Sequence, residues 1–338
     1  MLRLTPNEAA RPRTGTLLVA SAGGHLAQLH QLRPRLQGIG NQVTWVTFDT
    51  PQARSLLAGE RVIWARYTAP RDLPAVLANG AVAASALARL RPAQVISTGS
   101  AIALSFLPLA QATGASSHYV ESATRVDGPS ATGRVLARVP GIHLYTQHAG
   151  WADERWRHAG SVFDGYQARP RRPRPIGRIV VALGTMRTYG FRRLLDRLVE
   201  VLPAGVDVLW QTGCTDVAGL PIRAREAVPA AELHQAMREA DVVVTHAGTG
   251  SALAALEAGK LPILVPRTAA LGEHIDDHQH QTAAELSARR LAIGVEVGTL
   301  GPADFVTAAS VQVERRTDPP PIPLVGARLA GALRRSAA

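Results

Sequence analysis

The chain has 338 residues, 46% of them hydrophobic, and a net charge of +11, which predicts two globular domains of ordinary size and excludes disordered and fibrous classes. A single cysteine, Cys214, excludes a disulfide framework and is typical of a reducing compartment. The positive charge favours anionic partners, but no basic and aromatic residues alternate, so a nucleic-acid partner is not expected.

Short apolar segments alternate with longer helical patterns along the chain, which predicts parallel sheets built from βαβ units. In the first half, the predicted strands cover residues 16–20, 43–47, 62–65, 94–97, 117–120 and 142–146. An apolar, helix-favouring segment lies between residues 73 and 90.

Residues 167–177, QARPRRPRPIG, are rich in proline and arginine, which predicts a stiff, solvated linker between domains. The alternation then restarts, with predicted strands over residues 178–183, 207–211, 241–245, 262–265 and 292–295. A second proline-rich break, 317–323, precedes a predicted short helix over 324–335. The expected organisation is a domain over 1–166, a linker over 167–177, a second domain over 178–316 and a terminal segment over 317–338. Two doubly wound sheets of this kind place ligands at the carboxyl ends of their strands, in a cleft between the domains.

The first motif follows the first predicted strand, where Ser21, Gly23 and Gly24 precede His25 in SAGGH. Glycines let the backbone approach a ligand closely, and the amides at the start of the next helix carry positive partial charge. The motif is not the GxGxxG of dinucleotide-binding proteins. We interpret it as a ligand-binding turn, although a tight turn without a ligand has the same appearance.

The second motif is YVESATRVDGPSATGRVL, in which Glu121 directly follows an apolar strand. At the carboxyl end of a strand this side chain would act as a base or hold a substrate hydroxyl. An acid that satisfies free amides at a helix start would have the same position, and the residues alone leave both interpretations open. Gly99 and Ser100 form another glycine turn at the same predicted sheet edge.

Two further turns lie in the second half of the chain. Gly184 and Thr185 follow the strand over 178–183, where amides and a hydroxyl can bind a phosphate or its sugar. The stretch His246, Ala247, Gly248, Thr249, Gly250 and Ser251 follows the strand over 241–245 and opens a helix. Its amides and hydroxyls would make a diphosphate cradle. The Gly-Lys-Ser/Thr ending of a Walker loop is missing, so a kinase or NTPase is not expected.

The fifth motif is the polar segment GEHIDDHQHQ, residues 272–281. His274 and His278 would share one helix face, which suits zinc, but no His-Glu-x-x-His pattern and no third ligand of clear spacing is present. We therefore expect no metal here and interpret the segment as a cluster that meets sugar hydroxyls.

SAGGH, STGS, YVESATRVDGPSATGRVL, VALGT, THAGTGS and GEHIDDHQ occur in the order of glycosyltransferase family 28, which the chain resembles from about Leu17 to about Leu286. It is most similar to a fusion of the two subunits of eukaryotic dolichol-linked and bacterial exopolysaccharide sugar transferases, and is more distantly similar to the lipid II-forming transferase. The resemblance implies a GT-B fold, with the acceptor on the amino-terminal domain and a UDP-sugar on the carboxy-terminal one.

The same resemblance implies an inverting hexosyltransferase that needs no metal or other cofactor and moves a sugar from a UDP-sugar to a polyprenyl-diphosphate-linked glycan. It assigns His25 and Glu121 as candidate bases. Its expected acceptor residues are Ser21, Gly23, Gly24, Gly99, Ser100 and Arg125. Its expected donor residues are Gly184, Thr185, His246, Ala247, Gly248, Thr249, Gly250, Ser251, Glu273, His274, Asp277, His278 and Gln279.

The chain departs from the family pattern at one position. Aligned on Gly259, relatives place a ribose-binding glutamate where this chain has Ala254. Glu257 lies almost a helical turn further on and is expected at the surface, which leaves the ribose to another group such as Glu273.

No run of 18 apolar residues exists and the first 15 residues lack a signal-peptide core, so we expect a cytoplasmic protein without a spanning helix. A lipid-linked acceptor would bring it to the inner face of the membrane. We expect peripheral attachment to an anionic surface through residues 73–90 with Arg61, Arg66 and Arg71, although an ordinary buried helix fits the pattern equally.

The leading hypothesis is thus a glycosyltransferase of surface-polysaccharide assembly. A UDP-sugar epimerase shares the two-domain architecture and needs neither acceptor nor membrane. A non-catalytic nucleotide-sugar-binding scaffold is the alternative from a different class: His25 and Glu121 argue against it and Ala254 argues for it.

Overall fold

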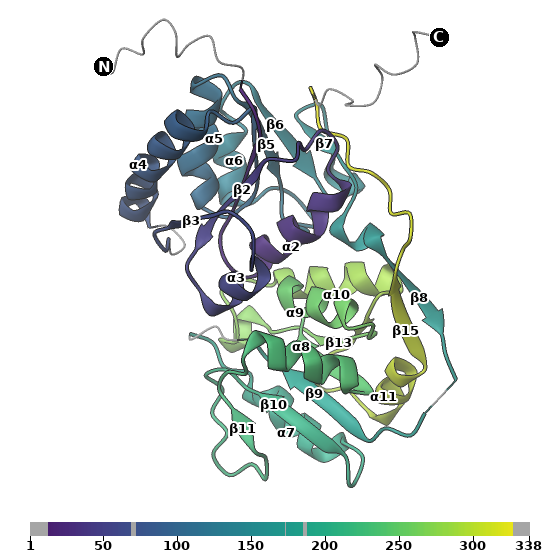
Figure 1. Cartoon of the computed structure of the whole chain (residues 1–338). Helices are drawn as coiled ribbons and strands as arrows, with labels where there is room; N and C mark the ends of the chain where they lie inside the picture. The colour runs from purple at the N-terminus through teal and green to yellow at the C-terminus, as the bar shows by residue number, and fades with distance from the viewer. Residues whose placement is uncertain (1–12, 69–71, 173, 185–187, 327–338) are drawn as a thin grey trace, which may run out of the picture. The chain divides into compact units, whose positions relative to one another are not determined.

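The computed structural model describes residues 13–68, 72–172, 174–184 and 188–326, and the chain divides into two compact units (Figure 1). Within the described residues, unit 1 contains residues up to 122 together with 129–159 and 321–326, and unit 2 contains 123–128 and 160–320. The division differs from the predicted one in three places. It falls at Gly160 rather than at Gln167, the segment 123–128 groups with unit 2, and the chain returns to unit 1 at Pro321.

Unit 1 is built on a parallel sheet with the strand order β3-β2-β1-β4-β5-β6-β7. Its strands are β1 (Thr16–Ala20), β2 (Val43–Phe48), β3 (Val62–Ala65), β4 (Gln94–Gly99), β5 (Ser116–Val120), β6 (Ile142–Thr146) and β7 (Trp156–His158). Its helices are α2 (Gly24–Leu32), α3 (Pro51–Leu56), α4 (Leu73–Leu90), α5 (Ile102–Ala112) and α6 (Ala131–Leu136), with short 3-10 turns η1 (Arg33–Arg35) and η2 (Ala149–Trp151). The strands predicted for this half are confirmed, and β7 was not predicted.

The core of unit 1 follows from the alternation of side chains along its strands. Leu17 and Val19 of β1 point to one face, where they join Ala83 of α4 and Phe106 of α5 in one apolar cluster. Figure 1 shows α4 and α5 side by side on that face. The two helices cover β1 and β4 and so fix the turns that follow these strands.

Unit 2 repeats this architecture with the strand order β11-β10-β9-β12-β13-β14. Its parallel strands are β9 (Arg178–Ala182), β10 (Asp207–Gln211), β11 (Ala224–Arg225), β12 (Val242–His246), β13 (Ile263–Val265) and β14 (Ile293–Gly294). Its helices are α7 (Arg192–Val201), α8 (Ala230–Glu239), α9 (Thr249–Glu257), α10 (His278–Ala288) and α11 (Pro302–Ala309), with 3-10 turns η3 (Val162–Gly165) and η4 (Ala269–Leu271). Ile179 and Val181 pack on one face of the sheet, whereas Val180 and Ala182 pack on the other.

The predicted linker is partly a strand. Residues 166–170 form β8 (Tyr166–Pro170), which pairs antiparallel with β15 (Val311–Arg315). A strand paired on one side only leaves its other edge free, so proline and arginine are tolerated there. Near the carboxyl end, Ile322 forms a bridge with Leu36 of unit 1. Leu324 to Gly326 are not helical, and the rest of the helix predicted over 324–335 lies outside the described residues.

Both sheets have the strand order of doubly wound folds, in which connections run outward in opposite directions from a central pair. In unit 1 this pair is β1 and β4, and in unit 2 it is β9 and β12. Ligands of such sheets bind outside the carboxyl ends of the central pair. The turns at 21–25, 99–100, 184 and 246–251 follow these four strands, so the predicted glycine motifs lie where this topology places a ligand.

Among the described helices, α4 is long and apolar enough to cross a membrane, with a mean hydropathy of 1.4 over its 18 residues and 28% of it buried. The sequence analysis expected no spanning helix because no 18 apolar residues follow one another without interruption. The mean hydropathy of α4 is high nevertheless, because the polar Asn79 and Arg89 are few among apolar neighbours. Core helices of soluble proteins pass the same test, so this property alone indicates no membrane crossing.

Candidate functional site

Ser21, the first residue of the turn after β1, forms hydrogen bonds with the turn after β4. The Ser21 amide donates to the Gly99 carbonyl at 2.8 Å, and the Ser100 amide donates to Ser21 Oγ at 3.1 Å. Gly23 has φ of +86°, a conformation that side chains rarely adopt, and Gly24 opens α2. The structure therefore brings together the predicted acceptor residues of SAGGH and STGS.

His25, on the first turn of α2, is held by Thr98 through two hydrogen bonds. Its Nδ1 lies 2.6 Å from the Thr98 carbonyl, and Thr98 Oγ1 donates to the His25 carbonyl at 2.8 Å. A carbonyl only accepts, so Nδ1 carries the proton and Nε2 is the basic nitrogen. Gly99 permits this packing, because a β-carbon there would lie 3.2 Å from the imidazole Cε1.

Glu121 is 1% exposed and its carboxylate is fully engaged. Oε1 accepts from Tyr119 Oη at 3.1 Å and from the Ser122 amide at 3.0 Å. Oε2 accepts from the amide and the hydroxyl of Ser130, each at 2.9 Å. Burial raises the pKa of Glu121, and these hydrogen bonds oppose that rise.

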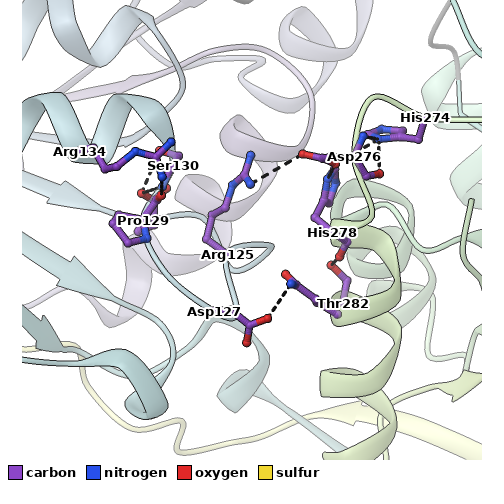
Figure 2. A network of polar contacts seen from close by, with 11 residues as sticks. Arg125, Asp127, Pro129, Ser130, Arg134, His274, Asp276, His278 and Thr282 are labelled. Atoms are coloured by element: carbon purple, nitrogen blue, oxygen red, sulfur yellow. Dashed lines mark hydrogen bonds and ion pairs between the residues drawn. The ribbon is translucent and has the colours of Figure 1, made fainter. Parts of the chain in front are cut away.

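Ser130 also caps α6, because its hydroxyl accepts from the Gly133 amide. Figure 2 shows Ser130 beside Arg134, which donates to the Pro129 carbonyl at 2.8 Å. Glu121 therefore fixes the start of α6, as in the helix-start interpretation that the sequence left open.

Arg125 was predicted with the acceptor residues, but its segment groups with unit 2. Its Nη1 lies 3.9 Å from Asp276 Oδ2, and Figure 2 shows the guanidinium pointing toward that carboxylate. Asp127 of the same segment accepts a hydrogen bond from Gln281 at 2.6 Å. The structure thus places Arg125 beside the polar segment predicted for the donor.

In unit 2, the His246 ring lies between two glycines. A β-carbon at Gly184 would lie 2.8 Å from His246 Cε1, and one at Gly248 would clash with Nε2. Burial lowers the pKa of His246 to about 3, and the nearby positive charge of Arg267 adds to this effect. The imidazole is therefore neutral at pH 7. Thr185 lies outside the described residues.

The amino end of α9 has no side-chain cap in the described structure. The Gly248 amide donates to the His246 carbonyl at 2.7 Å. The amides of Thr249, Gly250 and Ser251 begin the helix and carry the positive end of its dipole. Thr249 is 4% exposed, and its Oγ1 has no hydrogen-bond partner among the described residues. Uncapped amides beside an unpaired buried hydroxyl are suited to an anion with several oxygens.

Arg267 is a residue that the sequence analysis missed. It follows β13, is 2% exposed, and donates from Nη2 to the Leu183 carbonyl at 2.9 Å. Its Nε is buried without a hydrogen-bond partner in the described structure. Nothing in the local sequence VPR distinguishes a buried arginine from a surface one. Its backbone amide donates to Gln279 Oε1 at 3.1 Å, so the buried Gln279 holds this strand end in place.

Glu273 is 8% exposed and pairs with Arg193 through two hydrogen bonds of 3.0 Å. It also accepts from the Thr268 amide at 3.0 Å. The carboxylate suggested as an alternative ribose ligand is therefore held by protein donors.

His274, Asp276 and His278 form the cluster at the right of Figure 2. One possible ligand atom of each lies within 4.8 Å of the others, so geometrically the three could hold a metal ion. His278 hydrogen-bonds Asp276 through Nδ1, and His274 Nδ1 lies 3.1 Å from the Asp276 carbonyl. Burial raises the Asp276 pKa, but His278 and Arg125 outweigh it and the pKa is lowered. The third ligand that the sequence did not supply is Asp276, whereas the predicted Asp277 accepts from the Ala269 amide at 2.8 Å.

The position of the missing ribose glutamate has an apolar environment. Ala254 packs against the cluster that contains Val180 and Ala182. Glu257 is not the surface residue that was expected, because its side chain is 15% exposed. It accepts from Tyr166 and Arg315, which fastens α9 to the β8–β15 pair. Neither residue reaches the uncapped end of α9, which is at the other end of the helix.

Residues 179–297 match the glycosyltransferase family 28 C-terminal domain. The matched segment lies within unit 2 and runs from β9 to β14, which indicates that the chain is a glycosyltransferase. No curated protein sequence matches the chain. The glycosyltransferase is similar in structure to MurG of Acinetobacter baumannii, with a TM-score of 0.52, 18% identity, and coverage of 87% of this chain and 89% of MurG.

Two further solved structures have higher TM-scores. SnogD of Streptomyces nogalater has 0.57 at 17% identity, covering 88% of this chain and 91% of its own. The spinosyn forosaminyltransferase SpnP has 0.55 at 18% identity, covering 88% and 89%. At these identities the likeness establishes the fold, which is GT-B as predicted. The family 28 domain and this fold make the chain a glycosyltransferase.

Proposed function

We propose that the glycosyltransferase transfers a sugar from a UDP-sugar to a polyprenyl-diphosphate-linked glycan, with inversion, in exopolysaccharide or capsule synthesis. The observation that carries the proposal is the uncapped amino end of α9, which lies beside the central strand pair of a family 28 domain. In this proposal Thr249, Gly250 and Ser251 bind the donor diphosphate through their backbone amides, at the turn that Gly248 begins. The match to the family 28 C-terminal domain supports a nucleotide-sugar donor, and the resemblance of SAGGH, YVESATRVDGPSATGRVL and GEHIDDHQ to that family supports uridine and a lipid-linked acceptor.

His25 is the proposed general base. Because Nδ1 donates to the Thr98 carbonyl, Nε2 holds the lone pair that takes the proton from the acceptor hydroxyl. The acceptor oxygen then forms a bond to the anomeric carbon while the bond from that carbon to the β-phosphate oxygen breaks. The electron pair of the broken bond leaves on UDP, so its negative charge increases as the proton moves to His25. Amides at α9 stabilise that charge without a cofactor or metal.

Glu121 is not proposed as the base. A carboxylate whose oxygens accept four hydrogen bonds inside the protein has no lone pair directed at a substrate. Its proposed role is to position α6 and the segment that follows β5.

A cytoplasmic location at the inner face of the membrane is part of the proposal, because that is where a polyprenyl-linked acceptor is accessible. An exposed apolar group on unit 1 supports it: Trp64 and Tyr67 at the end of β3, and Leu73 and Leu77 on α4, which are 39%, 66%, 67% and 77% exposed. Asn79 ties these segments together by bonding the backbone of Arg66. Arg61 and Arg66 are exposed in the same part of the chain, whereas Arg71 lies outside the described residues. Apolar side chains flanked by basic ones are suited to an anionic lipid surface.

In the decisive experiment, the protein is incubated with a panel of UDP-sugars and undecaprenyl-linked acceptors, and the masses of the lipid products are measured by mass spectrometry. A lipid product heavier by one hexose unit supports the proposal. An epimerised UDP-sugar without a heavier lipid would instead indicate an epimerase, and binding without any turnover would indicate a scaffold.

The base assignment is tested with His25→Ala, and His158→Ala serves as control because His158 is an exposed histidine of the same unit. We expect His25→Ala to lower transfer by about 10²-fold or more while UDP binding persists. Full activity in this variant would remove His25 from the mechanism.

Membrane attachment is tested by sedimentation with anionic vesicles. The double variant Leu73→Ser/Leu77→Ser is expected to remain in the supernatant, whereas Leu271→Ser, at a leucine of unit 2 that is 58% exposed, is expected to bind as the unmodified protein does. Equal sedimentation of both variants would contradict attachment through α4.

A further inference from the structure

Arg267 carries a charge that the fold has not neutralised by a direct ion pair. The residue is 2% exposed and lies between the sheet and the ring of Phe191, 5.6 Å from the ring centroid. Its hydrogen bond to the Leu183 carbonyl uses one nitrogen, and its Nε has no hydrogen-bond partner in the described structure. A buried guanidinium with unsatisfied donors destabilises a protein unless something compensates it.

The nearest acidic candidate is Glu273, and it is already paired. Both of its oxygens accept from Arg193, and the Thr268 amide adds a third bond. Arg193 also lies 5.9 Å from the same Phe191 ring. Two arginines and one carboxylate around Phe191 therefore leave one net positive charge. Burial lowers the pKa of Arg267, and Cys214 and Glu273 oppose this effect. An arginine guanidinium remains protonated in proteins at pH 7, so the group keeps its positive charge.

The position of this charge relative to the donor turn follows from three contacts. Arg267 bonds the Leu183 carbonyl, which directly precedes Gly184. Gly184 packs against the His246 ring, and that ring packs against Gly248 at the start of α9. The guanidinium thus lies at the turn that follows β9, and its positive charge acts on the His246 ring that packs against the start of α9.

We propose that Arg267 is the fixed positive charge of the donor diphosphate site, acting through the buried region beneath the His246 and Gly248 turn rather than by direct contact. This inference rests on the proposed donor site and adds a residue to it. In a region of low dielectric, a buried charge acts over a longer distance than a solvated one. The residue positions the diphosphate, and its effect grows as negative charge accumulates on departing UDP.

The role predicts that ligands are discriminated by the charge of their phosphates. Arg267→Met removes the charge and keeps an apolar side chain of similar length, Arg267→Gln keeps a hydrogen-bond donor without charge, and Arg267→Lys keeps the charge. Arg178→Met is the matched control, because it removes one exposed arginine charge from the opposite end of β9.

Binding of UDP, UMP, uridine and inorganic pyrophosphate is measured by calorimetry, and thermal unfolding is measured without ligand. For Arg267→Met and Arg267→Gln we expect UDP affinity to fall about tenfold or more, while uridine affinity changes less than about twofold. Arg267→Lys is expected to retain most of the UDP affinity, and Arg178→Met all of it. Because the removed charge lacks a direct ion pair, the unliganded neutral variants are expected to unfold at the same temperature as the unmodified protein or higher.

Other results separate this inference from the proposed function. The role of Arg267 would be overturned if Arg267→Met and Arg267→Gln lost UDP and uridine affinity equally, or if both kept the UDP affinity of the unmodified protein. The proposed donor site would be unaffected by either result. If the unmodified protein bound pyrophosphate in an Arg267-dependent way but not uridine or UDP, the uridine donor would be wrong and the charge role would stand. If it bound none of the four ligands, both would fall. Should Arg267→Met not fold, Arg267→Gln carries the same test.

Discussion

Replacing Gly248 with alanine puts a methyl group where the His246 ring lies, since an ideal β-carbon there overlaps Nε2. The backbone itself does not resist the change, because φ of −77° at Gly248 is available to alanine. The ring is also confined by Gly184 on its other side, so it has little space to move. The cost is therefore one of overpacking, which is typically about 1–3 kcal/mol.

We expect Gly248→Ala to lower the unfolding temperature by roughly 2–12 °C, from about 2–4 °C per kcal/mol in a domain of this size. UDP affinity should fall as well, because the amides that begin α9 move with residue 248. Thermal unfolding and UDP titration measure the two effects. Gly298→Ala is the control, since its β-carbon would meet no atom within 4 Å.

A double-mutant cycle with His246→Ala tests the reasoning itself. Removing the ring removes the clash, so Gly248→Ala should cost little in the His246→Ala background. The coupling between the two changes should be about 0.5–3 kcal/mol in size. If Gly248→Ala were equally destabilising with and without the ring, or cost nothing in either, the proposed packing of the donor turn would be refuted.

Four further outcomes are expected. Glu121→Gln should destabilise unit 1 by about 1–3 kcal/mol, because the new side-chain NH₂ would face the Ser130 amide and hydroxyl, which are donors themselves. The pH dependence of transfer should not change. If the decrease in transfer rate at low pH disappeared in this variant, Glu121 would be a base after all. The buried His118 has its pKa lowered from 6.5 to about 3, so the unfolded chain binds the proton first, and stability should be lost as the pH falls from about 6.5 toward 3. The loss of stability between pH 7 and pH 5, measured by urea unfolding, should be smaller by about 2 kcal/mol in His118→Asn than in the unmodified protein, while the contribution of His246 remains. An unchanged loss would contradict burial of a neutral imidazole at residue 118. Glu257→Ala should lower the unfolding temperature by a few degrees, because Tyr166 and Arg315 lose their acceptor, and a variant as stable as the parent would show that these bonds are not formed in solution. Transfer should continue in EDTA, since helix amides and arginine replace a cation at the diphosphate; activity lost in EDTA and restored by Mg²⁺ or Mn²⁺ would argue for a metal.

The sequence predicted the strands of the two central sheets well because most of them are short apolar segments between polar ones. Residues 16–20, 62–65, 142–146 and 207–211 were predicted with the bounds that β1, β3, β6 and β10 have. Such strands are continuous apolar runs that stand out from their polar surroundings. The missed strands are of a different kind. β8 and β15 pair with each other although most of the unit 2 sequence lies between them. Neither is a continuous apolar run, since β8 is YQARP and β15 is VQVER.

The candidate site was predicted where glycine determines the backbone and missed where burial determines the chemistry. Gly23, Gly99 and Gly184 have positive φ, and a motif search finds such residues directly. Arg267 could not be found this way, because only the folded packing of Phe191 and Leu183 removes it from water. The role of Glu257 was decided by a partner distant in sequence, Arg315, and that of Glu121 by a turn that brings Ser130 back to its carboxylate. Local sequence holds no signal for such partners.

The order in which the chain leaves the ribosome has a consequence for how this protein folds and how it can be divided. β8 emerges before any of the unit 2 sheet, yet its partner β15 comes at the end of that unit. Leu36 likewise meets Ile322 only after the whole of unit 2 has been synthesised. A gene cut within 167–177 would therefore give an amino-terminal fragment that lacks Ile322, the bridge partner of Leu36. The carboxy-terminal fragment would lack part or all of β8. A permuted gene that begins at Gly160 and keeps residues 160–326 together would preserve the β8–β15 pair and Ile322 in one piece, and is the better starting point for expressing unit 2.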